Sequence, residues 1–109
     1  MGREDLLKSI RKEFGEQSMF LLGDTDKLDI KVRSSGSLLL DLALGGGYPH
    51  GRIIELRGSE KSGKTTLANL AIAEAQRNEP ELECAIIDLE NTYNPEWART
   101  LGVDTDKLL

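Results

Sequence analysis

The 109-residue sequence has one cysteine, one histidine and no long apolar run. The single cysteine, Cys84, excludes an internal disulfide and a cysteine-based metal cluster. No apolar stretch has the length needed to cross a bilayer, and the charged start lacks the apolar core of a signal peptide, so we expect a cytoplasmic protein with no membrane partner. A formal net charge of −5 gives no overall basic footprint for nucleic acid, although it does not exclude a local DNA site.

The clearest motif is a glycine-rich run that fits the phosphate-loop pattern G-x-x-x-x-G-K-[ST]. Its residues are Gly58, Ser59, Glu60, Lys61, Ser62, Gly63, Lys64 and Thr65. The two glycines let the backbone turn its N–H groups inward, Lys64 reaches the terminal phosphates, and the Thr65 hydroxyl ligates Mg²⁺. The motif therefore predicts that the protein holds the phosphates of a nucleotide.

The residues around this motif predict an α/β fold with a parallel sheet. The β-branched run 52–56 is typical of a buried strand, and apolar residues recur at helical spacing from Lys64 to Asn78, just before Pro80. A second apolar run, 84–89, completes a strand–helix–strand unit. Two strands are too few for a complete sheet of this type, so we expect the core to be truncated.

The N-terminal part predicts a helix–strand arm. Leu6, Leu7, Ile10 and Phe14 lie on one face of a helix over 4–14, Gly15 ends it, and 19–22 is a possible strand. Polar residues over 24–36 suggest a linker, and 38–44 a short helix that begins after Ser37 and ends at three glycines. We expect the arm, residues 1–33, to pack either on the core, residues 34–109, or on another subunit.

Two carboxylates, Asp88 and Glu90, end the second predicted strand, at the edge where ligands bind in open α/β sheets. Both lie on the same side of a strand, so spacing alone allows either to face the phosphates. Asp88 fits a metal-side acid or a strand-end cap equally well. A further helix should begin after Asn94, with Pro95 in its first position, and end at Gly102.

Taken together, these motifs closely resemble the bacterial RecA recombinases, in order and over nearly the whole chain. The residues that carry the resemblance are Ser35-Gly-Ser-Leu38, Leu40-Asp-Leu-Ala-Leu-Gly45, Pro49-x-Gly51-Arg-Ile, Glu55, Gly58-x-Glu60-x-Ser62-Gly-Lys-Thr-Thr66 and Ile87-Asp-x-Glu90. Ser59, Lys61 and Asn91 depart from the residues usual in the bacterial members, which suggests a divergent or phage-borne relative.

The resemblance implies a site for ATP and Mg²⁺. It makes Gly58 to Thr65 the ATP phosphate loop and Glu90, acting with Lys64, the catalytic carboxylate that activates the hydrolytic water. The metal-side aspartate of the family lies on a later strand, so Asp88 does not take that role. Asn94 and Trp97 match the positions beside the adenine, where an indole can stack on the base.

The resemblance also implies a DNA-dependent ATPase that binds single-stranded DNA and promotes strand exchange in DNA repair. It favours docking of residues 4–22 on the next subunit of a homo-oligomeric filament. The family's DNA-binding loops lie beyond Leu109, so this chain corresponds to the N-terminal portion alone. The alternatives are a related ATPase of RadA/Sms, KaiC or helicase type, and an interaction module that binds nucleotide without hydrolysis.

Overall fold

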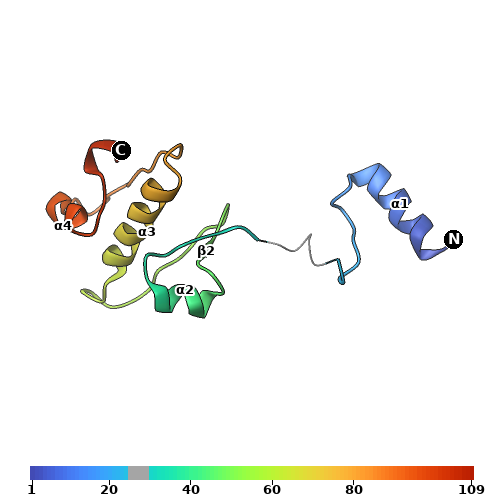
Figure 1. The fold of residues 1–109 in the computed structure, drawn as a ribbon, viewed down its shortest axis with the longest axis horizontal. Coiled ribbons are helices and arrows are strands. Elements are labelled where there is room, and N and C mark those ends of the chain that lie inside the picture. The colour runs from blue at the N-terminus through green and yellow to red at the C-terminus, as the bar shows by residue number, and fades with distance from the viewer. Residues whose placement is uncertain (25–29) are drawn as a thin grey trace. The chain divides into compact units, whose positions relative to one another are not determined.

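The computed structural model describes residues 1–24 and 30–109. They form two units, Met1–Ile30 and Lys31–Leu109 (Figure 1). The elements in chain order are α1 (Arg3–Phe14), β1 (Val32–Arg33), α2 (Leu38–Leu44), β2 (Tyr48–Pro49), α3 (Lys64–Asn78), α4 (Pro95–Thr100) and the 3₁₀ helix η2 (Thr105–Lys107). The predicted division at residue 33 stays a prediction, and residues 25–29 of the predicted linker lie outside the described part.

The first unit consists of α1 and the segment that follows it. The helix ends as predicted at Gly15, which has a φ of 97° and donates its N–H to the carbonyl of Arg11. The predicted strand over 19–22 is wrong: the Met19 carbonyl accepts a 2.8 Å hydrogen bond from Arg11 Nε, and no described strand lies beside it. Because ladder hydrogen bonds define a strand, apolar residues alone do not make one.

The second unit begins with a short antiparallel pair. β1 pairs with β2 in the register Val32 to Pro49 and Arg33 to Tyr48, so residues predicted as linker contain a strand. The predicted α2 connects the two and ends at Gly45 in the left-handed region, with a φ of 77°. Gly47 then passes so close to β1 that a Cβ on it would lie 2.1 Å from the Arg33 carbonyl oxygen. Only glycine fits there.

The predicted parallel sheet is absent from the described residues. Neither 52–56 nor 84–89 forms a strand, and Ile53 is 99% exposed. The only parallel pairing among residues 1–24 and 30–109 is a bridge between Cys84 and Leu108, extended by a 2.8 Å bond from Ile86 N to Leu109 O. The fold is therefore mostly helical. The β-branched residues of these two runs favour an extended backbone, but a strand forms only where a neighbouring strand pairs with its backbone N–H and C=O groups.

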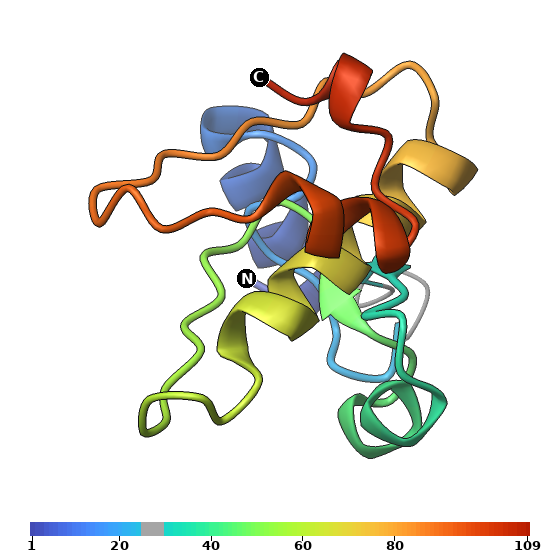
Figure 2. The same cartoon turned by 90° about the vertical axis from the view of Figure 1, so that its left-hand side faces the viewer.

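The core lies where α3 packs against α4 and the segment after it (Figure 2). Ala73, Ala98 and Val103 are its buried members, and Ile72, Tyr93 and Leu108 pack around them. Small residues let α3 and α4 approach closely.

α3 and α4 cover the predicted helical segments, and α4 begins with a side-chain cap, a 3.0 Å bond from Trp97 N to Asn94 Oδ1. Gly102, with a φ of 96°, turns the chain after this helix.

Candidate functional site

The loop between residues 58 and 63 takes a conformation that favours glycine at both of its ends. A Cβ on Gly58 would lie 2.5 Å from Ser62 Oγ, and Gly63, directly before α3, has a φ of 96°. Lys61 adopts a positive φ of 57°, which is uncommon for a residue with a side chain. The loop therefore curls tightly onto the first turn of α3, whose free N–H groups and dipole favour an anion.

Lys64, the first residue of α3, lies against this loop. Its Nζ donates to the carbonyl oxygens of Gly58 and Ser59, both at 2.8 Å. These bonds fold the ammonium group over the loop. A phosphate group bound in the loop would meet this ammonium group, which must then exchange carbonyl partners for phosphate oxygens.

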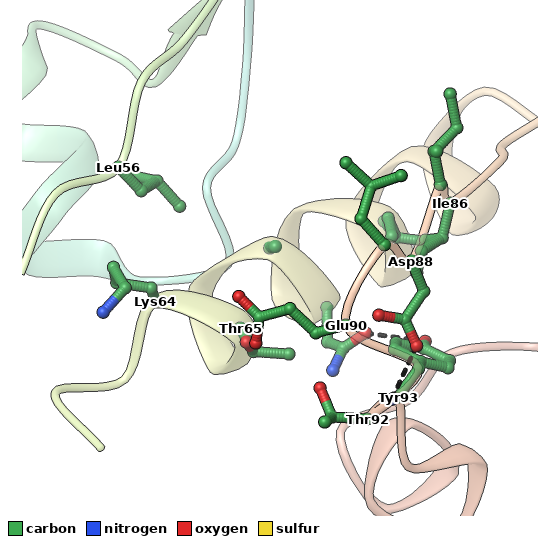
Figure 3. A pocket seen from close by; sticks show the side chains of 13 residues that line it. Leu56, Lys64, Thr65, Ile86, Asp88, Glu90, Thr92 and Tyr93 are labelled. Atoms are coloured by element: carbon green, nitrogen blue, oxygen red, sulfur yellow. Dashed lines mark hydrogen bonds between the residues drawn. The ribbon is translucent and has the colours of Figure 1, made fainter. Parts of the chain in front are cut away.

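An open cavity of about 480 Å³ adjoins the start of α3. Lys64, Thr65 and Glu90 all line it, so the structure brings together three residues that the sequence places up to 26 positions apart. Figure 3 shows the Glu90 side chain reaching from its turn toward Thr65. The cavity thus combines a cation, a hydroxyl and a carboxylate at a helix N-terminus.

Asp88, near the end of the apolar run, binds the backbone of the turn that follows. Its Oδ2 accepts a 2.8 Å hydrogen bond from the backbone N–H of Tyr93. This bond closes the turn 88–93, in which Asn91 takes a left-handed φ of 55°. The sequence left two possible roles for Asp88. In the structure its carboxylate accepts a hydrogen bond from a backbone N–H group.

A hydrogen bond that the sequence analysis missed joins this turn to α3. Tyr93 Oη donates to Asn69 Oδ1 at 2.8 Å, and Asn69 is only 1% exposed (Figure 3). Burial raises the pKa of Tyr93, which further favours the protonated hydroxyl that donates this bond. The one sequence signal for this bond was an asparagine in the middle of a predicted helix, since asparagine is a poor helix former.

The remaining predicted site residues lie outside this cavity. Lys61, Ser62 and Gly63 line a small hollow on the phosphate loop, and Glu60 is exposed in the same loop. Asn94 and Trp97 lie at the start of α4, where the Asn94 side chain caps the helix and Trp97 is 46% exposed. Neither lines the cavity that holds Glu90.

Comparison with known proteins assigns the chain to a family. Residues 3–109 match the RecA N-terminal domain. The chain belongs to the RecA family. It is 55% identical to Protein RecA of Mannheimia haemolytica over 104 residues, covering 94% of this chain and 28% of the relative. It is 52% identical to Protein RecA of Mycoplasma mycoides over 107 residues, covering 97% of this chain and 30% of the relative.

A third relative matches the chain to a similar extent. Protein RecA of Deinococcus radiodurans is 51% identical over 107 residues, covering 97% of this chain and 29% of the relative. The chain thus spans less than a third of the length of these relatives, and the match agrees with an N-terminal portion of the RecA sequence.

The described residues hold neither a cluster of metal ligands nor a membrane-spanning helix. Within residues 1–24 and 30–109, no cluster of three or more His, Cys, Asp or Glu side chains could hold a metal ion. In the same ranges, no helix is long and apolar enough to span a membrane.

Proposed function

We propose that this chain supplies the ATP-binding part of a DNA-dependent ATPase that promotes homologous strand exchange. The observation that carries this proposal is the shared cavity of Lys64, Thr65 and Glu90 beside a phosphate-type loop. Membership of the RecA family, whose matched relatives are named Protein RecA, supports recombination as the process that the ATPase serves.

In this proposal the loop and α3 bind the triphosphate. The backbone N–H groups of Gly58 to Thr65 turn toward the phosphates, and Lys64 neutralises their charge. Mg²⁺ commonly takes few protein ligands and completes its shell with water and substrate phosphates, so the Thr65 hydroxyl suits its binding here. The bound ion would supply charge neutralisation on the phosphate oxygens.

Glu90 is the proposed general base. Its carboxylate lines the same cavity as Thr65, on the turn that Asp88 closes. A carboxylate there can accept a proton from a water molecule that attacks the terminal phosphate, while Lys64 stabilises the charge that develops. Asn94 and Trp97, at the start of α4, are proposed to contact the adenine.

The proposed partners are single-stranded DNA and further copies of the chain. The apolar side of α1 supports assembly with further copies of the chain. Leu6 is 43% and Phe14 70% exposed, and no residue of α1 is buried. We propose that residues 4–22 dock on a neighbouring subunit of a filament. Leu6→Asp should reduce assembly in sedimentation experiments, whereas Lys8→Gln, at an exposed position away from the apolar side of the same helix, should not.

The main test measures ATP turnover by the full-length protein with and without single-stranded DNA. Glu90→Gln and Lys64→Ala should abolish DNA-stimulated turnover, because one removes the base and the other the phosphate cation. Glu96→Gln is the matched control, since Glu96 is exposed in the first turn of α4 and does not line the cavity. Normal turnover by Glu90→Gln would refute the catalytic assignment, and loss of turnover in Glu96→Gln would show that the assay reports damage to the fold.

A further inference from the structure

The Asn69–Tyr93 hydrogen bond lies between the two halves of the candidate site. Asn69 follows Thr65 by four residues on α3, so both side chains lie on the same face of the helix, one turn apart. Tyr93 follows Glu90 by three residues in the turn that begins at Asp88. The 2.8 Å bond therefore links the helix face that carries Thr65 to the turn that carries Glu90.

The contact is partly buried and anchored on both sides. Asn69 is one of two buried polar residues among those the structure describes, and Tyr93 packs against the core of Ala73, Ala98 and Val103. The backbone N–H of Tyr93 is itself bound by Asp88. A phenol held by its ring, its hydroxyl and its backbone has little freedom, and the burial of Asn69 limits the access of water to the bond.

We propose that Asn69 and Tyr93 are positioning residues that hold the Glu90 turn against α3. This inference rests on the proposed ATPase function. Both residues line the same cavity as Glu90, and their bond fixes how far Glu90 lies from the phosphate side of that cavity. General-base catalysis depends steeply on such placement, since a shift of about 1 Å can cost on the order of 100-fold in rate.

The test compares single and double variants in the full-length protein. Tyr93→Phe removes only the donor hydroxyl, and Asn69→Leu replaces the acceptor with an apolar side chain of similar size. Each should lower kcat for ATP about tenfold or more and leave KM within about twofold. The double variant should be no slower than the slower single variant, because both changes remove one interaction.

Tyr48→Phe is the matched control. Tyr48 also has a buried hydroxyl, but among the described residues this oxygen has no hydrogen-bond partner. The same chemical change there should leave kcat unaltered. A second measurement needs no nucleotide: hydrogen exchange over residues 88–93 should quicken in Tyr93→Phe and stay unchanged in Tyr48→Phe.

The outcomes separate this inference from the proposed function. If Glu90→Gln is inactive while Tyr93→Phe keeps its kcat and its slow exchange over 88–93, the positioning role is refuted and the ATPase assignment stands. If KM and kcat change in parallel, or if the two single effects add, the residues serve general stability and the inference fails. If Glu90→Gln turns over normally, both proposals fail.

Discussion

The Glu79 carboxylate accepts two hydrogen bonds from the Arg33 guanidinium, one of them from Nη2 to Oε2 at 3.1 Å. This pair connects β1 with the residue directly after α3, and both side chains are partly buried. The hydrogen bonds from Arg33 lower the pKa of Glu79, and those to Glu79 raise the pKa of Arg33. The pair therefore fixes the end of α3 that lies farthest from the loop 58–63.

Glu79→Gln should destabilise the protein at pH 7 and lower its urea midpoint, because it removes the charge and one acceptor of a bidentate pair. A lowered carboxyl pKa stabilises the fold above the unfolded-state value, near 4.5, and this gain is lost as pH falls through the folded pKa. The difference between wild type and variant should thus shrink below pH 4.5. Glu81→Gln, an exposed change two residues away, should match wild type throughout. A constant difference across this range would contradict the ion-pair explanation.

Thr65→Val should weaken binding of ATP in the presence of Mg²⁺ by about tenfold, equivalent to about 1.4 kcal/mol, because it removes the proposed metal ligand without changing side-chain size. In EDTA the variant and wild type should bind ATP equally, as measured by calorimetry. Thr100→Val is the control, because Thr100 is exposed on α4 and lines neither the cavity beside Glu90 nor the hollow on the loop. Equal affinities of Thr65→Val and wild type in Mg²⁺ would remove Thr65 from the proposed metal site.

Trp97 offers an optical probe, since it is the single tryptophan of the chain and is 46% exposed. If the adenine stacks on the indole, saturating ATP should change the tryptophan emission. Trp97→Ala should then weaken ATP binding by about 1–3 kcal/mol, and Trp97→Phe should retain most of the affinity while losing the signal. Unchanged emission under conditions where filter binding shows saturation would place the base elsewhere.

Ala98→Leu should destabilise the second unit by about 1–3 kcal/mol, measured by urea denaturation. Ala98 is fully buried in the core with Ala73 and Val103, where a larger side chain would push α4 away from α3. Ala43→Leu provides the control, because Ala43 is exposed on α2 and a leucine there faces solvent. Equal stability of both variants would show that this core accommodates added volume.

The helices were predictable because their signals are local. Repeating apolar residues, Ser37 and Asn94 at helix starts, and glycines at helix ends indicated α1 to α4, and the structure places them accordingly. Ser37 marks the start of α2 without capping it through its side chain. The strands were not predictable in the same way, because a strand needs a partner at the right position. The run 52–56 has the composition of a strand and lacks the partner, whereas β1 has a partner and little strand signal.

The sequence by itself determined which residues are candidates for the site, because the phosphate-loop motif consists of particular residue types at fixed spacing along one segment. It also determined the family. Tertiary structure alone decided that Glu90 shares a cavity with Lys64 and Thr65, and that Asp88 closes the turn through Tyr93. It alone revealed the Asn69–Tyr93 bond, because two residues separated by 24 positions meet only when α3 and the 88–93 turn pack together.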